Sequence, residues 1–154
     1  MENATTSSID TIAKSCIAVR LRLLNRVDTN LYDDALRPIG LKVSQLNILI
    51  VAARLGLARP GQVCGILQLD ASTLSRNVER MRARDWLEVV PGDDARAQPF
   101  RLTPAGKKLL ERTIPAWERA QHNAVEFLGQ EGVGLLAKAM KNARGGTSKS
   151  QTSS

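Results

Sequence analysis

The sequence predicts a mainly α-helical fold with one small β-hairpin. Apolar residues recur at spacings of three and four over most of the chain, which is the period of helices that bury one face. One short segment, residues 86–90, is rich in β-type residues and runs into Pro91-Gly92-Asp93-Asp94, a strong turn signal, before a return segment at 100–102. The 154 residues, 43% of them hydrophobic, are enough to bury a core without disulfides or metal ions.

The first three helices are expected before residue 70. Apolar residues from Ile9 to Ala35 predict one long helix that stops before Arg37, because Pro38 disfavours a helical conformation in the residue ahead of it. A second helix is expected from an N-cap at Ser44 to residue 56. Pro60 suits the first turn of a third helix.

The fourth helix carries the most informative pattern. Asp70 is a plausible N-cap, and Leu74, Val78 and Met81 lie about one turn apart on the face expected to be buried. Residues 71–84 contain four arginines and one acidic residue. The face opposite the apolar stripe is formed by Ser72, Thr73, Ser75, Arg76 and Arg80. This helix therefore presents hydroxyl groups near its start and guanidinium groups further along.

Helices are also expected after the hairpin. Thr103 and Pro104 provide a cap and a first-turn proline for a fifth helix that continues to Gly129, with a kink expected at Pro115. A sixth helix is expected over about residues 131–144. The Gly-, Ser- and Thr-rich residues 145–154 have little apolar area to bury, which predicts a disordered tail.

The order helix, short helix, helix, β-hairpin is that of a winged helix-turn-helix, in which the second helix of the pair enters the major groove of DNA. Short hydroxyl side chains suit phosphate oxygens, and arginine suits base edges. The net charge of +7, with a sequence pI near 10.0, favours a polyanionic partner. Double-stranded DNA is therefore the expected partner, with Ser72, Thr73, Ser75, Arg76 and Arg80 as its contacts.

Three segments resemble the MarR family of bacterial regulators, over roughly residues 9–143. They are Leu69-Asp70-Ala71-Ser72-Thr73-Leu74-Ser75-Arg76, then Asp94-Ala95-Arg96 followed by Leu102-Thr103-Pro104-Ala105-Gly106, and Leu36-Arg37-Pro38-Ile39-Gly40-Leu41 with Gln45 after it. The spacing between the Asp94-Ala95-Arg96 segment and the Leu-Thr-x-x-Gly segment is more specific than any one of these motifs alone.

The resemblance implies a homodimer on a pseudo-palindromic operator, acting as a repressor that a small-molecule effector of unknown identity releases. It implies that Arg96 enters the minor groove and that Asp94 holds its guanidinium. Pro99 departs from the pattern and suggests a short second wing strand. The implied division is a disordered N-terminus at 1–8, a dimerisation helix at 9–40, a winged helix-turn-helix at 41–102, dimerisation helices at 103–144 and a tail at 145–154.

Three other functions are less consistent with the sequence. Cys16 is placed like the thiol of redox-sensing relatives, but no tyrosine accompanies it after Leu41, which favours a buried structural thiol. The winged helix is alternatively a protein-interaction module. An enzyme is not expected, because the sequence shows no nucleophile and base set with an orienting partner.

Cofactors and metals are not expected either. His122 is the single histidine and lacks a second ligand at helical spacing. The polar start of the chain, the two separated cysteines and the lack of an apolar run of about 18 residues predict a cytoplasmic protein with no membrane partner.

Overall fold

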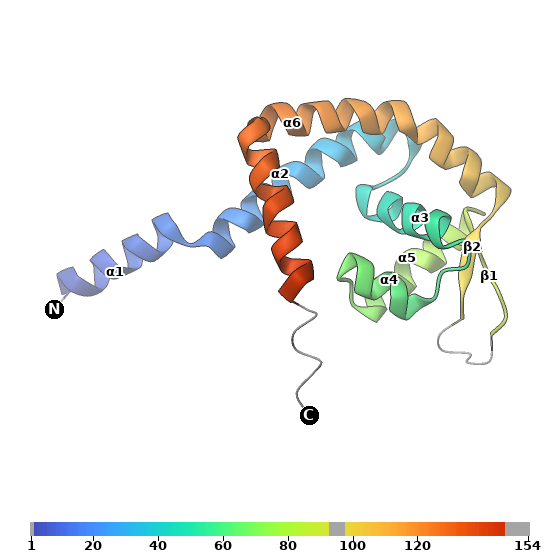
Figure 1. The fold of residues 1–154 in the computed structure, drawn as a ribbon, viewed down its shortest axis with the longest axis horizontal. Helices are drawn as coiled ribbons and strands as arrows, with labels where there is room; N and C mark the ends of the chain where they lie inside the picture. Colours follow the sequence, from blue (N-terminus) through green and yellow to red (C-terminus); the bar gives the residue numbers. More distant parts are fainter. Residues whose placement is uncertain (1, 93–97, 147–154) are drawn as a thin grey trace.

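A computed structural model describes residues 2–92 and 98–146. Two helices, α1 (Glu2–Ser15) and α2 (Ile17–Leu36), form an arm (Figure 1). Helix α1 and the start of α2 extend away from the rest of the molecule, whereas the second half of α2 packs against the C-terminal helix. A short 3-10 turn (Arg37–Ile39) then leads into α3 (Val43–Leu55), α4 (Pro60–Leu67) and α5 (Ala71–Ala83). Strands β1 (Leu87–Val89) and β2 (Phe100–Leu102) follow, and α6 (Pro104–Gly146) runs back over α2. The expected mainly helical winged helix-turn-helix fold is confirmed.

The hydrophobic core lies between α3, α4, α5, the hairpin and the first part of α6. Its largest fully buried side chains include Ile48 and Leu49 of α3, Met81 of α5 and Phe100 of β2. Leu36 at the end of α2 is also fully buried, so the base of the arm belongs to this core. The apolar period of the sequence predicted the buried face of α5 with Leu74 and Met81. In α3 it favoured Ile50 and Ala53, which are exposed, over Ile48, which is buried.

The hairpin is a two-stranded antiparallel sheet that a third segment extends. Val89 pairs with Phe100, and Leu87 pairs with Leu102. Phe100 also exchanges two backbone hydrogen bonds with Ala58, of 2.8 and 2.9 Å, so the wing is joined to the loop between α3 and α4. β2 has three residues and begins directly after Pro99, as the proline predicted. The Pro99 carbonyl still accepts a hydrogen bond from Val90, at 2.8 Å.

Several local expectations need correction at the ends of helices. Residues 2–8, expected to be disordered, belong to α1. The expected helix over 9–36 is interrupted at Cys16, whose extended backbone makes it the N-cap of α2. Lys42 and not Ser44 precedes α3, where the Gln45 side chain accepts a hydrogen bond from the Lys42 amide at 3.1 Å. A glutamine in the first turn thus satisfies an amide at the helix start.

The long C-terminal helix breaks at a glycine. Gly129 has φ 70° and ψ 161°, outside the helical region, and Figure 1 shows the sharp turn of α6 there. The backbone at Pro115, where a kink was expected, stays helical. Gly129 is the residue that adopts positive φ at little steric cost, which explains why the direction changes there. The two helices expected on either side of residue 129 are therefore present. Of the predicted tail, residues 147–154 lie outside the described part.

Within the described residues, no single helix is long and apolar enough to cross a membrane. The helices over Thr5–Ile39 and Val43–Leu55 meet such a criterion of length and composition only as a pair, which is bent by 78°.

Candidate nucleic-acid interface

Helix α5 starts from a cap that engages two of the predicted contact residues. The Asp70 carboxylate accepts hydrogen bonds from the Thr73 amide (2.8 Å), the Ser72 hydroxyl (2.6 Å) and the Thr73 hydroxyl (2.7 Å). The bonds from Ser72 and then Thr73 hold the pKa of Asp70 well below its usual range. Both hydroxyl hydrogens are thus directed at Asp70, so in this structure Ser72 and Thr73 complete the cap instead of offering free donors to a phosphate.

The outer face of α5 is a basic surface. Ser75, Arg76 and Arg80 are exposed, whereas Leu74 and Met81 on the opposite face are buried. No described side chain forms an ion pair or hydrogen bond with the Arg76 or Arg80 guanidinium; Arg82 instead lies 3.7 Å from Glu79. The two guanidinium groups therefore keep their donors available on a helix whose other side is fixed in the core, and we call this surface the basic face of α5.

The other two predicted contacts belong to the segment of the sequence between β1 and β2. Asp94 and Arg96 lie outside the described residues, so their roles stay predictions. The described part of the wing carries an ion pair across the two strands, between Glu88 and Arg101. Such a cross-strand pair helps to hold the register of the strands that lead to the tip.

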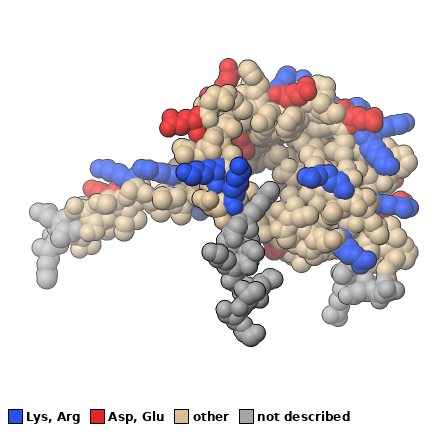
Figure 2. Space-filling model, in the orientation of Figure 1, with Lys and Arg blue, Asp and Glu red and all other residues tan. Residues whose placement is uncertain are grey.

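Charged side chains of both signs lie on the face of the molecule shown in Figure 2. In the view of Figure 2, several Asp and Glu side chains lie along the upper edge, where α6 runs. Lys and Arg side chains lie along the α1–α2 arm and around the winged part. Helix α6 itself carries more Lys and Arg than Asp and Glu residues, so charge alone does not separate it from the winged part as a surface for a polyanion.

The junction between the wing and α6 depends on residues whose structural role the sequence reasoning missed. The Thr103 amide donates to the Trp86 carbonyl at 3.2 Å, and the Gly106 amide donates to the Thr103 hydroxyl at 3.0 Å. A Cβ atom on Gly106 would lie 2.1 Å from the Trp86 carbonyl oxygen. Glycine is therefore required for α6 to start this close to the wing.

A second missed residue is Arg84, which caps the end of α5. Its guanidinium donates to the Gly40 carbonyl at 2.7 Å and lies 5.0 Å from the centre of the Trp86 ring. In the sequence, Arg84 stands two residues before Trp86, but this spacing does not indicate that Gly40 is the partner of Arg84.

The two cysteines are free and half-buried. Cys64, on α4, is partly buried and packs against the core. Cys16 lies at the break between α1 and α2 and is not the fully buried thiol that the sequence predicted.

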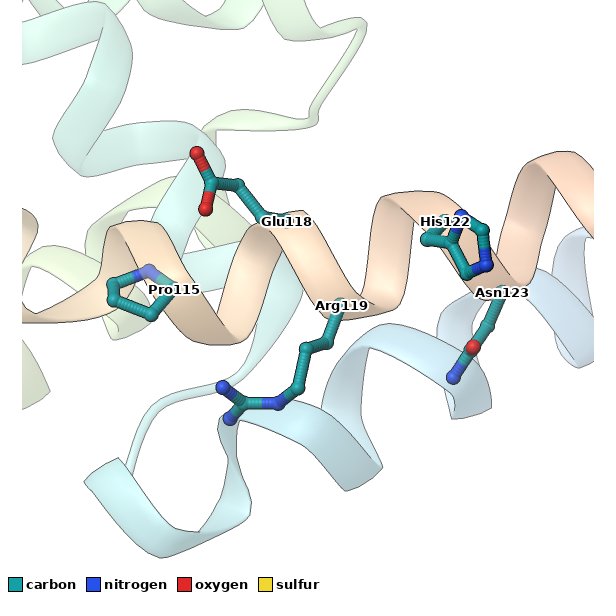
Figure 3. A pocket seen from close by; sticks show the side chains of 5 residues that line it. All are labelled: Pro115, Glu118, Arg119, His122 and Asn123. Atoms are coloured by element: carbon teal, nitrogen blue, oxygen red, sulfur yellow. The ribbon is translucent and has the colours of Figure 1, made fainter.

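His122 lies on the exposed side of α6, with its Nε2 atom 3.6 Å from Glu126 one turn later. It lines a shallow hollow of about 500 Å³ whose lining residues all belong to α6. Figure 3 shows that Glu118 and Arg119 point in opposite directions from the helix and do not converge on a shared point. Among the described residues, no three His, Cys, Asp or Glu side chains are grouped to hold a metal ion.

An apolar cavity of about 410 Å³ lies between α3 and α6. Trp117, which is 40% exposed, contributes to its wall from α6. The other lining residues are Leu46, Ile50, Ala53, Arg54, Leu110, Glu111, Thr113 and Ile114. The wall is thus mostly hydrophobic, with one cationic and one anionic side chain.

Comparisons with known proteins agree with this architecture. No family model matches the chain. The multiple antibiotic resistance protein MarR of Salmonella typhimurium is 25% identical over 91 residues, which cover 58% of this chain and 63% of MarR. An uncharacterised HTH-type transcriptional regulator of Bacillus subtilis, YwoH, is 27% identical over 79 residues, which cover 51% of this chain and 58% of YwoH. The matches therefore span less than two thirds of these relatives.

Solved structures match over more of the chain. A mutant MarR from E. coli in complex with operator DNA gives a TM-score of 0.75 at 18% identity, covering 86% of this chain and 96% of that one. BpsR of Bordetella bronchiseptica, whose DNA binding is regulated by 6-hydroxynicotinic acid, also gives 0.75, at 20% identity, covering 84% of this chain and 99% of BpsR. Taken together, the chain is similar in sequence to MarR and to an HTH-type transcriptional regulator, and it shares the winged helix-turn-helix fold of the solved MarR structures.

Proposed function

We propose that this chain is a sequence-specific, DNA-binding transcriptional regulator that acts in the cytoplasm, with α5 in the major groove. The observation that carries the proposal is the basic face of α5, where Arg76 and Arg80 are exposed and unpaired among the described residues while the opposite face is buried. Arginine at such a position reads guanine through paired hydrogen bonds. The relative solved with operator DNA supports the same use of the fold.

A homodimer is part of the proposal. Large apolar side chains on the arm are exposed, among them Ile12, Ile17 and Leu23 at 64%, 69% and 61%. Beyond the break at Gly129, Leu135 and Met140 of α6 are also exposed, at 61% and 53%. A second copy of the chain that covers these faces removes them from water and pairs two α5 helices for the halves of a pseudo-palindromic operator.

Repression relieved by a small molecule completes the proposal. The cavity between α3 and α6 joins the winged part to a helix of the proposed dimer, so a ligand that fills it acts on the spacing of the two α5 helices. Its volume of about 410 Å³ and mostly apolar wall suit a small molecule with a hydrophobic ring. The coupling is reciprocal, so the ligand and the DNA weaken each other's binding by the same factor.

The test is binding of the purified protein to DNA from its own promoter region and to a scrambled duplex, by fluorescence anisotropy over a salt series. Arg76→Ala should weaken promoter binding by roughly 5- to 150-fold, corresponding to about 1–3 kcal/mol for a base contact. Arg82→Ala is the matched control, because Arg82 lies on the same helix but is engaged with Glu79. Arg96→Ala should weaken the preference for A·T-rich flanks.

Two results would redirect the proposal. Equal, wholly salt-driven binding to both duplexes, unchanged in selectivity by Arg76→Ala, would contradict sequence-specific readout and favour the alternative of a protein-interaction module. Loss of promoter binding after mild oxidation, prevented by Cys16→Ser, would instead favour thiol-based regulation through the half-buried Cys16.

A further inference from the structure

Three parts of the fold meet at the side chain of Arg84. The residue caps the C-terminal end of α5, and its guanidinium donates to the Gly40 carbonyl in the turn between α2 and α3. The same guanidinium lies over the ring of Trp86, which directly precedes β1. Arg84 thus connects the end of the proposed recognition helix to the base of the arm and to the base of the wing.

The chemistry of these contacts favours arginine. A planar guanidinium can direct an N–H group at a carbonyl in its plane while its face lies against an aromatic ring. The accepting carbonyl belongs to Gly40, whose φ of 74° is in the left-handed region that glycine adopts readily, and its position closes the turn after α2. Segments 44 residues apart are therefore held by one directional contact.

The length of the arm amplifies any change of angle at the contact between Arg84 and Gly40. Figure 1 shows that α2 leaves the winged part at its base and extends away from it, so a small rotation at the base becomes a large displacement at the far end. In the proposed dimer the arms join the two copies. The angle between α5 and α2 then fixes the separation of the two α5 helices, and hence the spacing of the DNA half-sites.

We propose that Arg84 is a positioning residue that fixes the angle between α5 and α2 and thereby sets the half-site spacing that the dimer accepts. This inference rests on the proposed function. Arg84 itself acts through Gly40 and Trp86 and not through a base contact.

The first experiment measures binding to duplexes whose half-sites have the optimal spacing, one base pair less or one more, and to a single half-site. Wild type should prefer the optimal spacing at least tenfold. Arg84→Met, which keeps an unbranched stem, should reduce that preference to under threefold while single half-site affinity stays within twofold. Arg84→Lys should restore part of the preference, since it keeps a donor but loses the planar group. Arg82→Met, the matched control, should behave as wild type.

A second measurement does not depend on DNA. The native cysteines are first replaced by Cys16→Ser and Cys64→Ser. Nitroxide labels at Arg22→Cys and Ala71→Cys then report the distance between α2 and α5. Labelled protein is diluted into unlabelled protein so that only distances within one chain are measured. Arg84→Met should broaden this distance distribution, and Arg82→Met should not.

The outcomes separate the two proposals. Unchanged spacing preference in Arg84→Met, or an unchanged distance distribution, would overturn the positioning role. An equal loss of single half-site affinity would show that Arg84 contacts DNA instead. If the wild type does not select promoter DNA, the proposed function fails, and a broadened distribution still supports Arg84 as the residue that holds α5 to the arm.

Discussion

Replacing Gly106 with alanine tests the junction on which the position of the wing depends. The added Cβ atom would lie 2.1 Å from the Trp86 carbonyl oxygen and 3.0 Å from a methyl carbon of Leu102. Because the first of these neighbours is backbone, it cannot move aside as a flexible side chain can. Overpacking of this kind costs about 1–3 kcal/mol. Separating Trp86 from the Thr103 amide adds about 1 kcal/mol.

One effect opposes this loss, because alanine is favoured over glycine inside a helix by about 0.5–1 kcal/mol. The net expectation for Gly106→Ala is a decrease of about 1–3 kcal/mol in the free energy of unfolding. Urea unfolding followed by circular dichroism, at one fixed protein concentration, should show a midpoint lower by about 1 M with an unchanged slope. A midpoint equal to or above that of the wild type would refute the reasoning from this close contact.

Gly65→Ala is the matched control for that experiment. Gly65 lies inside α4, and a Cβ atom there meets no neighbour within 4 Å. The same change should therefore raise the free energy of unfolding by about 0.5–1 kcal/mol. Opposite signs at the two glycines would separate the steric effect from helix preference.

Two further predictions concern titratable side chains. Asp70→Ala should lower the midpoint of thermal unfolding. Because the pKa of Asp70 is depressed in the folded state, the difference in midpoint from wild type should be at its maximum above about pH 4 and should disappear as the pH falls through the folded-state pKa. A difference in midpoint that persists in strong acid would contradict the cap. Tyr32 donates to Gln121 across α2 and α6, and burial, followed by the charge of Asp28, raises its pKa above 10.0. The stability that this tyrosine contributes should be fully present below about pH 10 and lost as the pH rises through the folded pKa. The advantage of wild type over Tyr32→Phe, measured by urea unfolding, should therefore stay constant up to about pH 10 and shrink above it.

Some features that depend on neighbours in sequence were predicted, although the break at Cys16 and the N-cap at Lys42 were not. The end of α2 at Leu36 and the start of α4 at Pro60 follow from the backbone geometry of proline. The cap of α5 was also predictable, because Asp70 lies three residues before Thr73, whose amide donates a hydrogen bond to the Asp70 carboxylate. The break at Gly129 was placed correctly, but a kink at Pro115 was expected and the backbone there stays helical.

The sequence by itself determined which face of α5 is buried and which carries Arg76 and Arg80, because helical periodicity and side-chain chemistry are local properties. Only the tertiary structure decided that Ser72 and Thr73 are engaged by Asp70, that Gly106 must lack a side chain, and that Arg84 reaches Gly40. The last two depend on segments that packing brings together from distant parts of the chain. No spacing within a helix or turn encodes such a contact, since it exists only once the core has placed both partners.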